Sequence, residues 1–230
     1  MPRLFILVEG ETEETFVNEV LGPHLYNKGF EAVSAKLMGN ARLRSQRGGI
    51  RGWPEVKREI VRHLKSDRQV FITMMVDYYG MPSHPKKTKA WPGRNRAATL
   101  PFSEKAPCVQ SALTANIQKE LKDVRRFLPF VLMHEFEALL FSDCNKFAAG
   151  IGRPHLATKF QTIRNAFNSP EEINDSPLTH PALRVMELVP EYQKPIFGSI
   201  AAIEIGLDAI CLECPHFRAW LQGLEGLART

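Results

Sequence analysis

Three strongly apolar runs and one weaker segment mark the first 141 residues of the chain. The apolar runs are residues 4–8 (LFILV), 70–76 (VFITMMV) and 127–133 (FLPFVLM), and the weaker segment is residues 32–38 (AVSAKLM). Apolar runs of this length are typical of strands buried on both faces, as in parallel sheets. Helical patterns separate them, so the predicted order is βαβαβαβ. This alternation predicts an α/β fold with a mostly parallel four-stranded sheet flanked by helices.

Proline positions refine the predicted elements. Pro54 stands at an early position of a helix predicted over residues 53–67, where its missing N–H costs little. A second helix is predicted over residues 107–123. Pro129 lies near the start of the fourth strand, where proline is tolerated, or it marks an edge strand.

The chain from Ser142 onward has a helical pattern. Breaks are expected at residues 150–154, 169–181 and 193–195, where glycine, proline and polar residues gather. We therefore expect two parts. Residues 1–141 form the α/β domain, and residues 142–230 form a helical C-terminal subdomain packed on it.

Composition favours a cytoplasmic protein with no membrane contact. The apolar fraction of 44% is ordinary for a globular chain, no run approaches the ~20 residues of a membrane span, and the N-terminal run is short for a signal peptide. We expect the four cysteines to be reduced thiols. Cys211, Cys214 and His216 resemble half of a zinc site, but without a second ligand pair buried thiols on a helix are the favoured interpretation.

Positive charge is concentrated in the first part of the chain. Residues 1–141 carry 22 Lys/Arg and 15 Asp/Glu, whereas residues 142–230 carry 8 and 10, which together give the net charge of +5. Much of the excess lies in two predicted loops, residues 39–52 and 80–107. Such loops are either solvated or suited to a phosphate backbone, so we expect DNA or RNA as a partner. The candidate contacts are Arg42, Arg44, Arg47, Arg51, Lys86, Lys87 and Arg94.

Aromatic residues accompany the second basic loop. Trp91 and the pair Tyr78 and Tyr79 stand among these positive charges. Exposed aromatic faces beside cations are typical of proteins that bind single strands.

Carboxylates follow three of the predicted strands. Glu9 follows the first strand, Asp77 follows the third, and Glu135 and Glu137 follow the fourth. The carboxyl ends of parallel strands share one edge, where open α/β sheets bind their ligands. Glu13 lies in the first turn of the next helix, where it either complements the helix dipole or joins this cluster.

Such a cluster is costly unless protons or cations neutralise it. Oxygen ligands alone suit Mg²⁺ or Mn²⁺, and two such ions can clamp a phosphodiester. We expect Glu9, Glu13, Asp77, Glu135 and Glu137 as metal ligands, with all except Glu13 also catalytic. In a purely structural alternative, one of Glu135 and Glu137 caps the next helix.

Several motifs resemble the domain-of-unknown-function 4276 family and the Toprim fold. Toprim domains occur in topoisomerases, primases and the overcoming-lysogenisation-defect (OLD) family of nucleases. The matching segments run along nearly the whole chain and are residues 9–13 (EGETE), 47–49 (RGG), 77–82 (DYYGMP), 134–141 (HEFEALLF) and 214–217 (CPHF).

The resemblance implies catalytic roles for Glu9 and Asp77. Toprim sites use a glutamate after the first strand and an Asp-x-Asp after the third, and Tyr79 stands where the second aspartate is expected. OLD-type nucleases have a second glutamate four residues after the first, and Glu13 of this chain matches it. They also have a Ser-x-Glu after the next strand, which residues 135–137 resemble, with Glu135 in place of the serine. A basic residue completes such sites, and Lys194 and Arg184 are both candidates. The likeness also implies phage defence beside an ATPase partner.

Three function hypotheses follow. The first is a metal-dependent nuclease that hydrolyses DNA or RNA. The second is a non-catalytic Toprim-like module that binds nucleic acid or a partner, which Tyr79 favours. The third is a phosphoacceptor domain with Asp77 as the acceptor, against which the basic loops and the additional glutamates argue.

Overall fold

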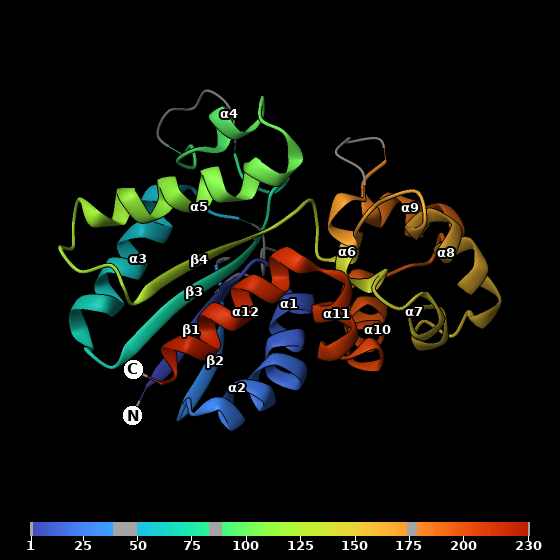
Figure 1. Cartoon of the computed structure of the whole chain (residues 1–230), viewed down its shortest axis with the longest axis horizontal. Helices are drawn as coiled ribbons and strands as arrows, with labels where there is room; N and C mark the ends of the chain where they lie inside the picture. Colours follow the sequence, from blue (N-terminus) through green and yellow to red (C-terminus); the bar gives the residue numbers. More distant parts are fainter. Residues whose placement is uncertain (1, 39–49, 83–88, 174–178, 230) are drawn as a thin grey trace.

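A four-stranded parallel sheet forms the centre of the molecule (Figure 1). The computed structural model describes residues 2–38, 50–82, 89–173 and 179–229. The strand order is β2-β1-β3-β4, and every neighbouring pair is parallel. The strands are β1 (Arg3–Val8), β2 (Ala32–Leu37), β3 (Val70–Asp77) and β4 (Phe127–Leu132). The predicted α/β fold is therefore confirmed, and it is consistent with a Toprim-like arrangement.

Helices cover both faces of the sheet (Figure 1). One face carries α3 (Trp53–Ser66), α4 (Arg94–Ala97) and α5 (Phe102–Gln118). The other carries α1 (Glu11–Phe16), the π-helical turn η1 (Val17–Leu21), α2 (Gly22–Lys28) and α12 (Pro215–Leu227). Residues of β1 alternate between the two cores, because Leu4 and Ile6 pack with Phe16 while Leu7 packs with Trp53.

The helix predicted over residues 107–123 begins and ends earlier than expected. It spans Phe102–Gln118, with Pro101 as the residue before its first turn and Pro107 inside it. Phe102 gains contact with the His134 ring, at 5.7 Å between ring centres, so packing at the helix start favours the earlier beginning. Pro129 lies near the start of β4, and β4 is an edge strand of the sheet, so both interpretations of this proline hold.

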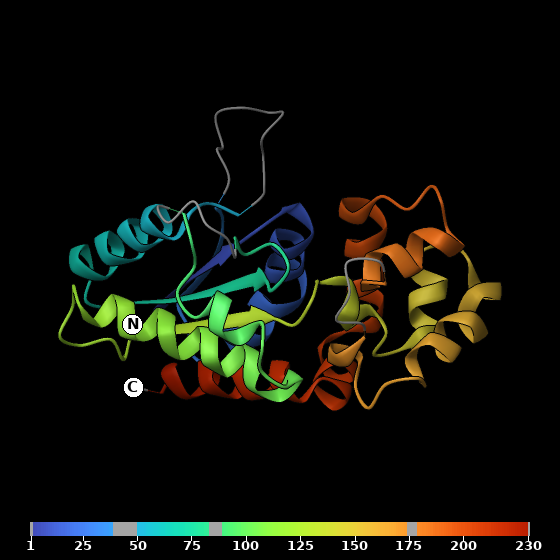
Figure 2. The ribbon, with the colours of Figure 1, turned by 90° about the horizontal axis from the view of Figure 1, so that it is seen from above.

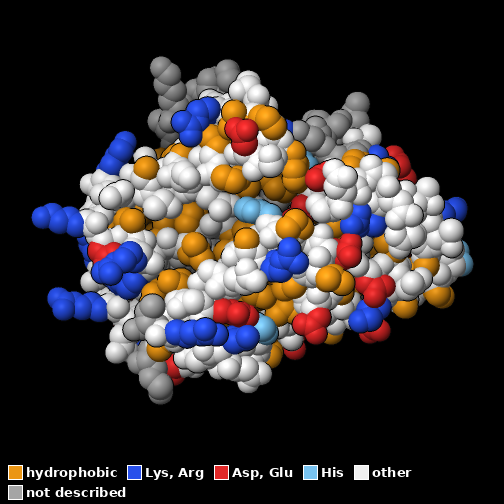
Figure 3. Space-filling view, in the orientation of Figure 1, with side chains coloured by type: hydrophobic (Ala, Val, Ile, Leu, Met, Phe, Trp, Pro, Cys, Tyr) orange, Lys and Arg blue, Asp and Glu red, His pale blue; other side chains and the backbone are white. Residues whose placement is uncertain are grey.

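Most of the C-terminal part lies beyond the carboxyl ends of the strands (Figures 1 and 2). Its helices are separated near the breaks predicted at residues 150–154, 169–181 and 193–195, and also at Gly206 and Cys214, where no break is predicted. These helices are α6 (Glu137–Leu140), α7 (Cys144–Gly150), η3 (Pro154–Leu156), α8 (Ala157–Arg164), η4 (Pro170–Glu172), α9 (Pro181–Leu188), η5 (Lys194–Gly198), α10 (Ser199–Ile205) and α11 (Leu207–Glu213). We call this segment, α6 to α11, the helical region. Charged side chains of both signs mix over its surface in the view of Figure 3.

The last helix, α12, returns to the sheet. Trp220 stacks on Phe130 of β4 with 4.4 Å between ring centres, and Phe217 packs edge-on against Phe16 of α1. Glu171 of η4 caps the start of α12, accepting hydrogen bonds from the backbone N–H groups of His216 (2.9 Å) and Phe217 (3.0 Å). Burial raises the pKa of Glu171 to about 7. One continuous core thus joins the sheet to the helical region.

The four cysteines are free thiols, as predicted. Across the described ranges, no single helix is both long and apolar enough to cross a membrane. Only the segment Lys194–Ile205 taken together with Leu207–Glu213, two pieces bent by 84°, meets that length and composition.

The contact between α12 and the sheet can be tested at Thr73. Its hydroxyl accepts a hydrogen bond from the buried Trp220 Nε1 at 2.9 Å. Thr73→Val keeps the shape but leaves this N–H without its acceptor, and it also removes the hydrogen bond that the hydroxyl donates to the Leu128 carbonyl, so we expect the free energy of unfolding to fall by about 1–3 kcal/mol. Urea denaturation measures the change. Thr114→Val is the control, because among the described residues the Thr114 hydroxyl bonds only to the Gln110 carbonyl within α5. An equal loss there would contradict the assignment.

Candidate functional site

The site lies where the connections of the sheet change direction. From β1 the chain passes to β2 on one side, and it then returns to β3 on the other side. A crevice between the carboxyl ends of two such strands is the usual ligand position in open α/β sheets. Glu9 follows β1 directly and Asp77 ends β3, so both acids stand at this crevice.

Glu9 is held against the end of β3. Its Oε2 accepts a hydrogen bond from the Asp77 backbone N–H at 3.4 Å. The backbone of Gly80 closes over the same carboxylate, and a Cβ at this position would lie 2.8 Å from both carboxylate oxygens. Burial raises the pKa of Glu9, with Glu135 and Glu137 adding to the effect.

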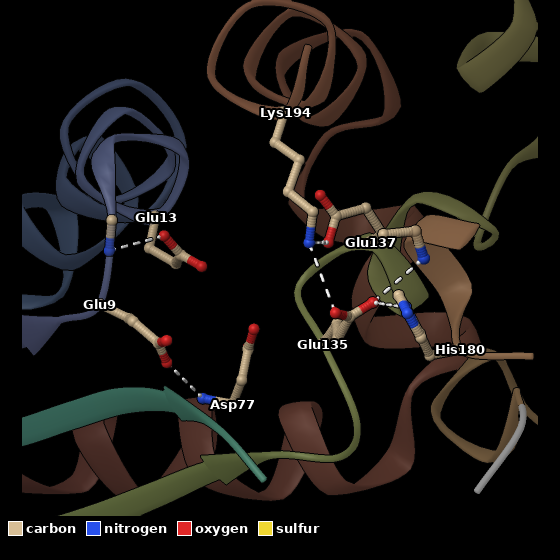
Figure 4. Close-up of polar contacts among 9 residues, drawn as sticks. Glu9, Glu13, Asp77, Glu135, Glu137, His180 and Lys194 are labelled. Carbon is tan, nitrogen blue, oxygen red and sulfur yellow. Dashed lines mark hydrogen bonds and ion pairs between the residues drawn. The ribbon is translucent and has the colours of Figure 1, made fainter. Parts of the chain in front are cut away.

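Glu13 faces the same space from the first turn of α1 (Figure 4). Its Oε2 accepts a hydrogen bond from the Gly10 backbone N–H at 3.1 Å, so it does cap the helix. However, it is only 6% exposed, and its pKa is raised to about 7 by burial first and then by Glu137 and Glu9. Both alternatives for Glu13 therefore hold together.

Asp77 is a further acid whose pKa is shifted upward. Its pKa is raised well above its ordinary value, first by burial and then by Glu9 and Glu13. The Oδ1 atom is buried and has no hydrogen-bond partner among the described residues. A buried carboxylate oxygen without a donor is costly unless a proton or a cation reaches it.

A left-handed turn at His134 brings the next acids into the site. His134 is a non-glycine residue with φ of 69°, and it is fully buried against Tyr79 and Phe102. Backbone strain of this kind persists only where the surrounding packing imposes it. Because α6 begins at Glu137 rather than Glu135, the turn lets both acids face the same partner.

That partner is Lys194, the first residue of η5. Its Nζ lies 3.1 Å from Glu137 Oε2 and 3.5 Å from Glu135 Oε1. The other oxygen of Glu135, Oε2, lies 2.7 Å from His180 Nδ1 and accepts the Ala182 backbone N–H at 3.1 Å. Figure 4 shows this group opposite Glu9, Glu13 and Asp77.

The site holds more acid than base. Burial lowers the pKa of Lys194, but Glu137, Glu135 and Asp77 together outweigh it, so the net shift is upward. Glu137 is 1% exposed, and burial raises its pKa despite the nearby lysine. Tyr192 lies close by, and its pKa is raised by burial and by Glu137 and Glu135. Lys194 therefore contacts Glu135 and Glu137 directly and faces Glu9, Glu13 and Asp77 across the site (Figure 4).

The two candidate basic residues lie in different surroundings. Lys194 contacts the acids, whereas Arg184 donates to the Thr179 carbonyl at 3.2 Å and lies over the Phe167 ring. No sequence pattern marks His180, since a lone histidine before a proline carries no specific signal, and Gly80 lies in the family-like segment 77–82 without any local sign of its contact with Glu9. Their roles appear only from contacts between distant segments.

The predicted nucleic-acid contacts are only partly described. Arg42, Arg44, Arg47, Lys86 and Lys87 lie outside the described residues. Arg94 donates from Nε to the Tyr78 carbonyl at 3.1 Å and stacks on the Tyr78 ring, so it supports the chain after β3. The carbonyl of Arg51 accepts the Trp91 indole N–H at 2.9 Å.

The prediction that Trp91 and Tyr78 present exposed ring faces is wrong. Trp91 is 3% exposed and packs on Trp53, and Tyr78 is 2% exposed. Both belong to the core beneath α3 and α5. Their burial is hard to predict because the surrounding sequence is rich in basic residues, which is typical of an exposed loop. Tyr79 stacks on His134 at 5.2 Å and meets His180 edge-on, so it supports the turn that carries Glu135.

The acids fit a hard divalent cation in their chemistry. Glu9, Glu13 and Asp77 offer carboxylate oxygens, which Mg²⁺ and Mn²⁺ prefer, and the buried Asp77 Oδ1 has no hydrogen-bond donor in the described chain. Within those same residues, no three His, Cys, Asp or Glu side chains already form a compact ligand group. Both oxygens of Glu135 are engaged by Lys194 and His180.

The raised pKa of Glu13 predicts a pH-dependent stability. Its folded value of about 7 lies above the ordinary 4.5, so the folded state binds more protons between these values. Stability should therefore fall as pH rises from about 4.5 to 7 and stay low above it. Relative to Glu13→Gln, we expect the wild type to lose up to about 3 kcal/mol between pH 5 and 8.

Urea denaturation in the presence of EDTA measures this difference. Glu11→Gln is the matched control, because Glu11 lies in the same helical turn but is exposed. Equal pH profiles for wild type and Glu13→Gln would contradict the raised pKa.

Comparisons with known proteins give one family and one similar solved structure. A family model described as a domain of unknown function (DUF4276) matches residues 8–225. No curated protein matches the chain. A solved structure of the C-terminal region of the Xanthomonas campestris pv. campestris OLD protein is similar, with 17% identity, a TM-score of 0.43, and coverage of 100% of this chain and 97% of that chain. The family match spans almost the whole sequence, and the chain therefore belongs to the DUF4276 family.

Proposed function

We propose that the protein is a metal-dependent nuclease that hydrolyses phosphodiester bonds in DNA or RNA. The observation that carries the proposal is the group of acids at the switch point, of which Glu13 is buried and Glu9 and Asp77 are half-buried, and whose pKa values are all raised. Perturbed carboxylates in a crevice are typical of functional sites, since a purely structural cluster of this cost has little reason to persist. A cation would restore their charge at neutral pH.

Mg²⁺ or Mn²⁺ is the proposed cofactor, held by Glu9, Glu13 and Asp77. A bound divalent ion would polarise a phosphoryl oxygen and lower the pKa of a water molecule. Glu9 is positioned for this role by Gly80 and by the Asp77 N–H. Glu135 and Glu137 complete the acidic wall, and either could join the ion if Lys194 moved aside.

Lys194 is the proposed charge stabiliser for the substrate. Its ammonium group reaches into the site from η5, and its side chain is 41% exposed, so a phosphate can approach it. Cations aimed at developing negative charge lower the barrier of phosphoryl transfer. His180 holds Glu135 in place from the rim of the site.

A non-catalytic binding module is the second candidate. Lys194 already neutralises part of the acidic charge without any metal, and Tyr79 supplies an aromatic ring where Toprim sites carry a further acid. Such a module would bind nucleic acid or a partner, such as an ATPase subunit, without cleaving.

Cleavage and ion binding are tested together. We expect plasmid and RNA cleavage with Mg²⁺ or Mn²⁺, loss of at least about 100-fold in Glu9→Gln and Asp77→Asn, and little change in Glu11→Gln. At pH 8 the ion should also raise the free energy of unfolding of the wild type, by about 2.7 kcal/mol at 100 times its Kd. Neither acid variant should show this gain. Full activity in both acid variants would remove the metal site.

Gly80 tests the position of Glu9 without removing a carboxylate. A Cβ at Gly80 would meet both Glu9 oxygens at 2.8 Å, so Gly80→Ala must displace them. A displacement of about 1 Å can cost a catalyst up to about 100-fold, and we expect a loss of at least tenfold in kcat/KM. Gly226→Ala is the control, because a Cβ there meets nothing within 4 Å. Unchanged activity in Gly80→Ala would show that Glu9 takes no part.

A further inference from the structure

The outer face of α3 carries a row of basic side chains that no part of the candidate site uses. Trp53, Val56, Ile60 and Leu64 turn inward to the core, while Arg58 and Arg62 are exposed one turn apart. Arg51 precedes the helix, and Lys89 lies beside its start, with side-chain carbons about 3 Å from a Cβ built on Gly52. We call Arg51, Arg58, Arg62 and Lys89 the α3 basic surface.

Two hollows flank this surface. One, of about 480 Å³, is lined by Arg58, Arg62 and Lys89 together with the start of α3. The other, of about 460 Å³, is lined by Arg51, Arg58 and Arg62. Arg58 and Arg62 thus stand on the ridge between two depressions, where a ligand chain could contact them from either side.

The acids near the surface are largely neutralised by other residues. Glu120 pairs with Lys57 at 3.0 Å, and Glu59 pairs with Lys36 at 2.6 Å. Glu55 lies in the first turn of α3, where it complements the helix dipole. Arg58 and Arg62 make no hydrogen bond or ion pair with any described residue, so their guanidinium groups remain available.

The surface is fixed to the chain that leaves the candidate site. The indole N–H of Trp91 bonds to the Arg51 carbonyl, and Trp91 packs on Trp53 at the start of α3. Arg94, in the same segment, bonds to the carbonyl of Tyr78, which directly follows Asp77. The helix α3 begins near the carboxyl ends of the strands, where the acids lie, and runs away from them (Figure 2).

We propose that the α3 basic surface binds the phosphodiester backbone of the nucleic acid and guides it to the acidic edge. Arg58 and Arg62 lie about 6 Å apart along the helix axis, which suits a ligand of repeated negative charge. The inference rests on the proposed function for its substrate class.

Binding in the presence of EDTA tests the surface apart from any cleavage. The probes are short fluorescein-labelled duplex and single-stranded DNA, with fluorescence anisotropy measured over a series of salt concentrations. For Arg58→Gln with Arg62→Gln, we expect affinity to fall at least about tenfold and the slope of log K against log salt to become shallower by about 1.8 on duplex DNA. Lys159→Gln with Arg229→Gln is the control, since both residues are exposed and lie elsewhere.

Several results would overturn the proposal. Absence of DNA binding by the wild type is one, and unchanged affinity and slope in the α3 pair is another. If the control pair lowers the DNA affinity as much as the α3 pair does, the loss reflects net charge and not a specific surface. Poly-glutamate that binds as tightly as DNA at matched charge and salt would assign the surface to acidic proteins instead.

The two proposals can fail separately. If the α3 pair weakens binding but no metal supports cleavage, the surface holds and the nuclease does not. If metal-dependent cleavage occurs and the α3 pair leaves both binding and cleavage unchanged, the nuclease holds and the surface does not.

Discussion

The contact of Lys194 with Glu135 and Glu137 is the interaction on which the site depends. Five carboxyl groups gather at one edge, and this lysine offsets part of their repulsion. It comes from η5, far along the chain from β1 and β3, so the helical region must lie against the sheet for the cluster to exist. Packing of α10 and η5 on α1, with Gly198 beside Thr12, holds it there.

The sheet can be predicted well from the sequence, because strands buried on both faces require continuous runs of apolar residues. Continuous apolar runs can hardly be anything except buried strands or helices, and their length and spacing favour strands. Once the strands are parallel, Glu9 and Asp77 must share an edge. That part of the site follows from local pattern and topology alone, without knowledge of any side-chain contact.

The remaining parts of the site depend on packing between distant segments. Nothing local distinguishes Lys194 from Arg184, yet one reaches the acids and the other lies over Phe167. Likewise, the prolines and cations around Trp91 predict an exposed loop, whereas the indole is buried on Trp53. Local composition predicts whether a segment is polar enough to be exposed, but contacts with distant segments determine which of its side chains are buried.

With Tyr79 in place of an aspartate, this site has less negative charge and more aromatic packing. An aspartate here would add charge to a cluster that one lysine already fails to neutralise, and it could not stack on His134. The tyrosine instead supports the left-handed turn that carries Glu135, and through His180 it fixes that acid from a second side. Compared with a site that has an aspartate at this position, the chain has one potential ligand fewer at the end of β3, and the acid opposite, Glu135, is held by both His180 and Lys194. A divalent ion would complete such a site by entering beside Asp77 Oδ1, the buried oxygen with no donor among the described residues.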